Sequence, residues 1–381
     1  MVNYPDGWTL STVDQIVDIG TGCRDTQDNI PYGRYKFFVR SPIVERIDVA
    51  DYDCEAVLTA GDGVGTGKVF HYVNGLFSAH QRVYVMNNFR NVLGKYFFYY
   101  FSKYFIYEVE KYTAKSSVDS VRRPMIAEME IPLPTIKEQQ RIIETISTFD
   151  THIANLTELI EKKMAIREGA LEELVNGRTR LKGFNSERKT LELGSIATIQ
   201  DGTHGTFKRT STGFYLLSAK NVFNNRLVIG EEESKVSEYD YNRIRANGYP
   251  QKGDILLSCV GTIGRCCILQ EDNYVFQRSV AFIRTTNICN RYLAYVLQSK
   301  DIQGQLQSMV NASAQGGIYL GSLRKVEITI TLDNEEQEAI ANTLTAMDAE
   351  IEALEIERNK MIQIREGAMD DLLTGKVRLT D

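Results

Sequence analysis

The chain carries one long helical segment twice. The run Ile166-Arg167-Glu168-Gly169-Ala170 returns 198 residues later as Ile364-Arg365-Glu366-Gly367-Ala368. The register holds without a gap, and 9 of the 18 positions in 164–181 are identical in 362–379. The segments that precede the two copies are related far more weakly. This duplication predicts one scaffold element that is repeated, with a different head before each copy.

Apolar residues in both copies alternate steps of three and four, which is the spacing of a coiled-coil seam. The seam positions are Ile142, Ile146, Phe149, Ile153, Leu156 and Ile160 in the first copy and Ile340, Leu344, Met347, Ile351 and Leu354 in the second. Each copy stops near a glycine, Gly177 or Gly375, which suits a helix C-terminus. A helix of about 40 residues at ~1.5 Å per residue is a rod of roughly 60 Å. We expect the two copies to pack antiparallel within the chain, although the same seam could join two chains.

The repeat divides the chain into four segments: 1–130, 131–181, 182–327 and 328–381. The first and third are expected to be small α+β domains, because short apolar runs bounded by Gly, Asn and Asp alternate with helical runs that begin near Tyr96 and Tyr292. Aligning Gly33 with Gly213 and Gln81 with Gln277 leaves about 16 extra residues in the second head. The predicted fold class is therefore α+β, with two small mixed α/β heads separated by an antiparallel coiled coil of two long helices in a pseudo-two-fold internal repeat.

The two helices have different entry sequences. Ile131-Pro132-Leu133-Pro134 precedes the first, and its prolines are expected to end the incoming strand. Ile328-Thr329-Ile330-Thr331 precedes the second, so we expect that junction to be less rigid.

The net charge of −6 conceals an uneven distribution. Residues 182–327 carry 18 Lys and Arg against 13 Asp and Glu, whereas residues 328–381 carry 5 against 13. Acidity is concentrated in the last helix, and the second head is basic. A basic head suits contact with phosphate groups.

Composition also limits the compartment and the cofactors. No stretch approaches the roughly 20 apolar residues of a membrane span, and the N-terminus lacks the features of a signal peptide, so we expect a cytoplasmic protein. The six cysteines form no Cys-x-x-Cys pair, and we expect them to be buried, reduced thiols that bind no metal.

Catalytic motifs are not recognisable. The glycine-rich run 61–69 lacks the spaced glycine and the Ser or Thr of a phosphate-binding loop, because Asp62 and Val69 occupy those places. The four histidines are dispersed, and no Ser or Cys lies in a nucleophile elbow. The sequence therefore predicts a chain that performs no chemistry alone.

Polar loops, glycine-rich turns and basic runs supply the candidate nucleic-acid contacts, since their donors can reach base edges or phosphates. Ordinary solvated surface is the alternative for each, and salt bridges within a head are the alternative for the Gln-Arg pairs. The candidates are Arg24, Thr26, Gln27, Arg34, Lys36, Arg40, Lys68, Gln81 and Arg82 in the first head, and Thr203, His204, Lys208, Arg209, Lys220, Arg265, Gln277 and Arg278 in the second.

Together these motifs resemble the DNA-specificity subunit of type I restriction-modification systems. The run 131–134 followed by Glu138-Gln139, with Gly177-Arg178 at the far end, resembles the central conserved region of that family. Glu336-Gln337 and Gly375-Lys376 resemble its distal conserved region. Asp201-Gly202-Thr203-His204 and Gly253-Asp254-Ile255-Leu256 are similar to parts of a target-recognition domain, and the first head has only a degenerate form of the latter, Ala56-Val57-Leu58-Thr59.

The resemblance implies a non-catalytic subunit in which each head reads one half of a bipartite, asymmetric target in double-stranded DNA. It implies that the helices dock two modification subunits, which supply S-adenosylmethionine-dependent methylation, and that restriction and motor subunits with ATP and Mg²⁺ join them. No cofactor, metal or membrane is expected for this chain itself. The alternative from another class is a coiled-coil interaction scaffold whose heads bind proteins or glycans.

Overall fold

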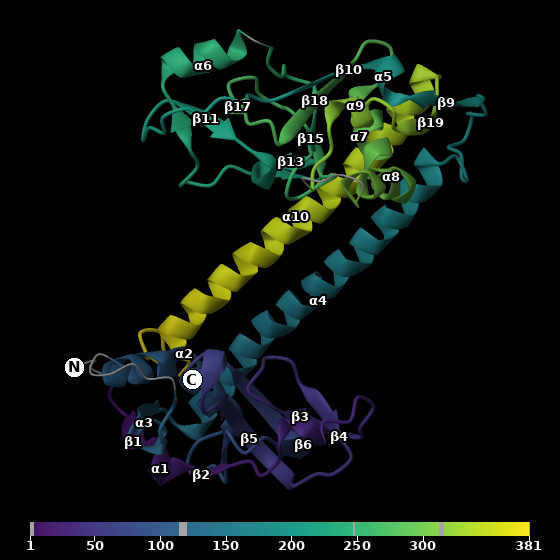
Figure 1. Cartoon of the computed structure of the whole chain (residues 1–381). Coiled ribbons are helices and arrows are strands. Elements are labelled where there is room, and N and C mark those ends of the chain that lie inside the picture. Colours follow the sequence, from purple (N-terminus) through teal and green to yellow (C-terminus); the bar gives the residue numbers. More distant parts are fainter. Residues whose placement is uncertain (1–3, 114–119, 247, 312–315, 381) are drawn as a thin grey trace. The chain divides into compact units, whose positions relative to one another are not determined.

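The computed structural model describes residues 4–113, 120–246, 248–311 and 316–380. Its contacts divide the chain into two compact units, one made of Met1–Leu156 with Glu357–Asp381 and the other of Thr157–Ile356. Each unit holds one head together with about half of each long helix (Figure 1). The unit boundaries therefore fall inside both helices, whereas the four segments of the sequence analysis separate helices from heads.

The first head is built on a six-stranded sheet. Its order is β2 (Asp18–Thr21), β7 (Val83–Asn87), β5 (Tyr52–Ala60), β6 (Phe70–Ala79), β3 (Tyr35–Phe38) and β4 (Glu45–Ile47). β3 and β6 are parallel, and the other neighbours are antiparallel. Residues of β5 alternate between two cores, with Val57 against α2 (Gly94–Thr113) and Leu58 against Phe77. The shorter elements are β1 (Thr9–Thr12), α1 (Val13–Ile16), η1 (Thr26–Asp28), η2 (Gly63–Gly65), α3 (Arg123–Ala127) and β8 (Glu130–Leu133).

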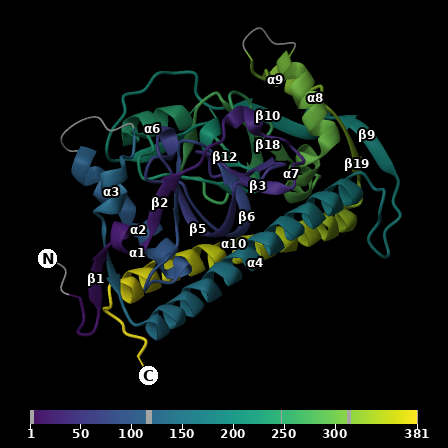
Figure 2. The same cartoon turned by 90° about the horizontal axis from the view of Figure 1, so that it is seen from below.

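The second head divides its strands among smaller sheets. One has the order β10 (Ala197–Asp201), β18 (Val280–Thr285), β15 (Ile255–Ser258) and β16 (Cys266–Ile268), and another has β14 (Lys235–Val236), β11 (Phe214–Leu217) and β17 (Val275–Phe276). A hairpin joins β12 (Val222–Phe223) to β13 (Arg226–Leu227). The helical elements are α5 (Leu193–Ile196), η3 (Ala219–Asn221), α6 (Glu238–Arg245), α7 (Asn290–Gln298), α8 (Lys300–Asn311) and α9 (Leu320–Leu323). β9 (Arg188–Glu192) and β19 (Glu327–Thr331) pair beside α8 (Figure 2).

The two heads share one path with insertions in the second. Residues 48–51 join β4 to β5, whereas residues 237–254, which include α6, join β14 to β15. The alignment of Gly33 with Gly213 holds, because an added Cβ would lie 2.5 Å from the backbone of Ile47 in one head and 2.2 Å from that of Val236 in the other. The alignment of Gln81 with Gln277 is wrong by one residue: Gln277 pairs with Thr203 as His80 pairs with Arg24.

Both long helices are entered from a strand of the same kind. β8 pairs with β1 and β19 pairs with β9, each antiparallel. β8 ends at Leu133, directly before Pro134, as the sequence predicted, whereas Pro132 lies within β8 opposite Leu10. A two-stranded sheet tolerates this proline because each strand is an edge. The second entry is a strand paired along its whole length with β9, so the two junctions have the same construction.

The long helices match their predicted length. α4 (Ile136–Val175) and α10 (Asn334–Leu373) each have 40 residues. Each is followed by a glycine with positive φ, 68° at Gly177 and 73° at Gly375. The Gly177 N–H bonds the Leu174 carbonyl and the Gly375 N–H that of Leu372, which is a glycine-dependent helix end.

The seam residues pack partly against the heads. In the first unit Ile142 and Ile146 lie in the core that contains α2, and in the second Ile340 and Leu344 lie in the core that contains α7. At both helix entries the seam therefore shares a core with a head as well as with the other long helix. Of the remaining seam positions, Leu156 and Ile160 are buried, and Phe149, Ile153, Met347, Ile351 and Leu354 are half-buried.

The six cysteines are free, as predicted, but they are not all buried. Cys266 and Cys267 alternate along β16 into two different cores, whereas Cys23 is exposed. Within the described ranges, no group of His, Cys, Asp and Glu has the arrangement of a metal site. None of the described helices has the length and apolar character needed to cross a bilayer.

Candidate nucleic-acid interface

The predicted polar loops are attached to both heads in the same way. The Gly22 N–H bonds the Val83 carbonyl, and the Gly202 N–H bonds that of Val280. A Cβ at Gly22 would lie 2.1 Å from a backbone oxygen, and one at Gly202 would lie 2.2 Å from another. Only glycine permits this approach. The loops 22–27 and 202–209 are thus held at equivalent edges of their heads, where their following residues are exposed.

In the first head, aspartates orient the candidate arginines. Arg24 forms a two-pronged pair with Asp51, at 2.8 and 2.5 Å. The hydrogen bonds from Arg24 hold the pKa of Asp51 below its ordinary value. Gln81 donates to Asp25 at 3.2 Å, which ties the start of β7 to the loop. Arg24 and Gln81 therefore both pair with carboxylates of their own head, and for Gln81 this is the alternative stated from the sequence.

A second group on this head contains two candidates on one carboxylate. Asp62, which begins the glycine-rich turn, accepts from Arg40 at 2.6 Å and also from Arg82. Burial opposes the charge of Asp62, but the hydrogen bonds from Arg82 and Arg40 leave its pKa lowered. Because Arg82 follows Gln81, the polar contacts run from Asp51 to Arg40 across the head.

The other first-head candidates are less constrained. Arg34 lies 3.8 Å from Asp48 and 5.5 Å from the ring centre of Tyr35, and its side chain is mostly exposed. Thr26, Gln27, Lys36 and Lys68 are exposed, with no side-chain partner within the part of the chain that the structure describes.

The second head presents its candidates differently. His204 contacts Asp201 at 2.8 Å, and Thr203 accepts from the Gly205 N–H. Lys208, Arg209 and Arg278 are exposed and have no carboxylate partner among the described residues. Lys220 pairs with Glu233 at 2.9 Å, and Gln277 is fixed by its bridge to Thr203. The two heads thus offer different polar surfaces at equivalent loops.

Arg265 lies beside a long helix. Its guanidinium stacks on Phe223 at 4.8 Å and lines a cavity of about 550 Å³ together with Asp348 and Glu352 of α10. Arg265, which follows the glycine-rich turn, therefore stacks on the β12–β13 hairpin of the second head, and its role as a DNA contact stays a prediction.

Sequence reasoning missed the residues that orient the cations. Asp51 and Asp62 lie 27 and 22 residues from the arginines they bind, Arg24 and Arg40, so no local pattern joins them. It also missed Arg243 of α6, which stacks on Phe207 in the polar loop at 5.1 Å. The signal available for α6 was its position in the insertion of the second head.

The scaffold contacts of one unit recur in the other at the 198-residue shift. In the first unit Asp150 accepts from Arg365 and from Tyr99, both at 2.6 Å. In the second, Asp348 accepts from Arg167 at 2.8 Å and from Tyr295 at 2.7 Å. Burial raises the pKa of both tyrosines, and the carboxylate contacts raise it further. One aspartate in each unit therefore joins its head to both long helices.

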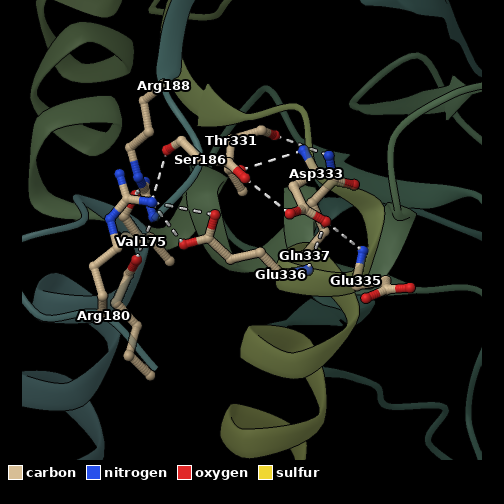
Figure 3. Close-up of polar contacts among 10 residues, drawn as sticks. Val175, Arg180, Ser186, Arg188, Thr331, Asp333, Glu335, Glu336 and Gln337 are labelled. Atoms are coloured by element: carbon tan, nitrogen blue, oxygen red, sulfur yellow. Dashed lines mark hydrogen bonds and ion pairs between the residues drawn. The ribbon is translucent and has the colours of Figure 1, made fainter. Parts of the chain in front are cut away.

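A buried glutamate at the start of each long helix also forms an equivalent pair in both units. Glu138, at the start of α4, accepts from Arg378 at 2.7 and 2.9 Å. Glu336, at the start of α10, accepts from Arg180 at 3.2 and 3.4 Å, as Figure 3 shows. The hydrogen bonds from Arg378 lower the pKa of Glu138. Each arginine lies just beyond the end of one long helix and joins that end to the start of the other.

Comparison with known proteins identifies the family. The model of the type I restriction modification DNA specificity domain matches residues 5–163 and 185–363. The specificity subunit of the type I restriction enzyme MjaVIII of Methanocaldococcus jannaschii is 25% identical over 345 residues, which is 85% of this chain and 79% of that protein. The specificity subunit of the Escherichia coli type I restriction enzyme EcoDI is 25% identical over 177 residues, 45% of this chain and 39% of that protein.

Solved structures support the fold. The S subunit of a type I restriction-modification system from M. genitalium superposes with a TM-score of 0.66 at 18% identity, covering 97% of this chain and 96% of that one. The two matched regions include both heads and most of both long helices. The chain therefore belongs to the type I restriction modification DNA specificity family.

Proposed function

We propose that this chain reads a bipartite, asymmetric DNA target, with one head on each half-site. The proposal rests on a difference between the scaffold, which is repeated, and the heads, which differ. The scaffold contacts of Asp150 and Glu138 recur at Asp348 and Glu336, whereas the loops of the two heads carry different side chains. A repeated scaffold with unlike reading surfaces suits two different half-sites.

The two heads are suited to recognition in different ways. The arginines of the first head are oriented by Asp51 and Asp62, and an oriented guanidinium is well placed to bind a guanine edge. The loop cations of the second head lack such partners within the described ranges, so they are available to phosphate groups. We propose all the candidate residues named from the sequence as DNA contacts.

The duplicated helices would dock two modification subunits. Ile166 and Ile364 occupy equivalent positions and are 59% and 43% exposed. Gly169 and Gly367, three residues on, lie in the helix interior, where glycine costs about 1 kcal/mol relative to alanine. A Cβ at either would meet nothing within 4 Å, so packing inside the chain does not require glycine. Close approach of a partner's backbone to each helix would explain why both positions are glycine.

In this account the chain is a non-catalytic, cytoplasmic subunit. Its partners would supply S-adenosylmethionine-dependent methylation, and restriction and motor subunits would supply ATP- and Mg²⁺-dependent activity. α4 and α10 would pack antiparallel as a spacer that keeps the heads about one turn of DNA, ~10 base pairs, apart. Contacts within each unit support that direction, since Arg378 binds Glu138 in the first unit and Arg180 binds Glu336 in the second.

The test is to co-express the chain with its modification subunits and to map methylated bases genome-wide. We expect two unlike half-sites with a fixed spacer. Exchanging residues 188–331 for the equivalent head of a relative should change one half-site and leave the other intact. A contiguous site, or a change in both half-sites, would contradict the proposal. A protein- or glycan-binding scaffold would in addition show no steep loss of duplex DNA binding as salt rises.

A further inference from the structure

A cavity of about 400 Å³ lies in the second head beside the polar loop. The loop 201–207 forms one wall, and α6 with residues 248–250 forms another. The residues that matter for its chemistry are Asp201, His204, Phe207, Arg243, Tyr249 and Phe282. Aromatic rings and a guanidinium thus surround a space at the edge where the loop is held.

The wall that contains α6 is formed by the insertion in the second head. In the first head only residues 48–51 connect the equivalent strands, so it has no counterpart to α6. Two arginines of α6 behave differently. Arg245 donates to the carbonyl oxygen of Asp272 and stacks 3.9 Å from the ring centre of Tyr249, so it fixes the wall. Arg243 lines the cavity and has no hydrogen-bond partner among the described residues.

Arg243 is nevertheless held in place. Its guanidinium carbon lies 5.1 Å from the ring centre of Phe207, an arrangement that is attractive and leaves the N–H edge free to donate. The nearby carboxylate of Asp201 is engaged by His204 at 2.8 Å. Lys208 and Arg209, which follow Phe207 directly, are exposed cations. The cavity therefore combines an oriented, unpaired cation with two exposed cations in the adjoining loop.

We infer that this cavity binds a backbone phosphate of the DNA, with Arg243 as the donor, and that the first head has no equivalent site. The inference rests on the proposed function, because it assumes that the loop 202–209 lies on the duplex. It adds to that function a phosphate contact that the second head makes and the first head does not. An oriented guanidinium gives a charge-assisted hydrogen bond and releases a counterion from the DNA.

The experiment compares Arg243→Gln with Lys325→Gln in the full chain assembled with its partners. Lys325 is an exposed cation of the same head, two residues after α9 (Leu320–Leu323). Figure 1 shows α9 on the side of this head away from α6. The probe is a duplex that carries the mapped target. We expect Arg243→Gln to bind about tenfold more weakly and to reduce the slope of log affinity against log salt by about 0.9. Lys325→Gln should match the wild type.

Methylphosphonate substitution, which removes one phosphate charge at a time, identifies the contact. When one particular phosphate beside the second half-site is substituted, the wild type should bind the duplex more weakly. The affinity of Arg243→Gln should not change with the same substitution. Equal affinity and equal salt slope for Arg243→Gln and the wild type would overturn the phosphate site while leaving DNA recognition intact. Absence of salt-dependent duplex binding by the wild type would instead overturn the proposed function.

Discussion

Replacing Arg180 by methionine should destabilise one unit of the chain and spare the other. The side chain of Glu336 is 1% exposed, and among the described residues Arg180 alone donates hydrogen bonds to its carboxylate. Arg180→Met would leave that charge buried without a partner, which costs about 3–5 kcal/mol. Glu336→Gln should cost less, about 1–2 kcal/mol, because Arg180 is 29% exposed and still donates to the Ser186 carbonyl.

The equivalent change in the first unit should be milder. Arg378→Met also leaves a buried carboxylate, but the Trp8 indole N–H still donates to Glu138 at 3.3 Å. One remaining hydrogen bond to a charged group offsets about 1.5–3 kcal/mol of the loss. Arg180→Met should therefore be the more damaging substitution although the two arginines are equivalent in the repeat.

Urea titration distinguishes the two units because Trp8 is the chain's single tryptophan and lies in the first unit. Arg180→Met should lower the midpoint followed by circular dichroism and leave the Trp8 fluorescence midpoint unchanged, whereas Arg378→Met should lower the fluorescence midpoint. Combining Arg180→Met with Glu336→Gln should restore part of the lost stability, since no charge is then buried alone. Equal shifts of both probes in Arg180→Met, or a loss below about 1 kcal/mol, would refute this reasoning.

Three further outcomes follow from the same contacts. Asp62→Asn should release Arg40 and Arg82 and lower the ratio of target to random-duplex affinity by about tenfold in competition binding; an unchanged ratio would count against orientation by Asp62. Because its folded pKa is lowered, Glu138 should contribute stability that is present above its unfolded pKa of about 4.3 and lost as the pH falls through the folded value. The Trp8 unfolding midpoint should therefore fall more steeply with acid in the wild type than in Glu138→Gln, and parallel curves would exclude the effect. Gly169→Leu and Gly367→Leu should each remove one modification subunit, as measured by light scattering of the assembled complex, while the free chain is as stable as the wild type or more so; full assembly of both variants would contradict docking at these glycines.

The scaffold was predictable because its signals are local and repeated. The spacing of Ile142 and Ile146, the duplicated entry residues and the closing Gly177 together predicted the length and end of α4, and the same pattern predicted α10. The helices beginning near Tyr96 and Tyr292 were predicted from local helical runs, and the free cysteines from the lack of a Cys-x-x-Cys pair.

The interiors of the heads were not predictable, because they depend on partners distant in sequence. No local pattern indicates that β3 pairs in parallel with β6, or that β12–β13 turns Arg265 toward α10. Counting cations identified Arg40 and Arg82 but not Asp62, which determines how both are oriented. The exposed Cys23 was missed because its loop leaves the sheet at Gly22, a contact made through backbone atoms of another strand.

The most direct test of the central claim is to lengthen both long helices equally. Inserting seven residues after Leu156 and seven after Ile356 preserves the seam and adds about 10 Å, at most ~3 base pairs at 3.4 Å each. The account predicts that methylation mapping of the assembled complex finds both half-sites unchanged and the spacer between them altered. An unaltered spacer, or a changed half-site sequence, would contradict the claim that the helices separate two independent readers of DNA.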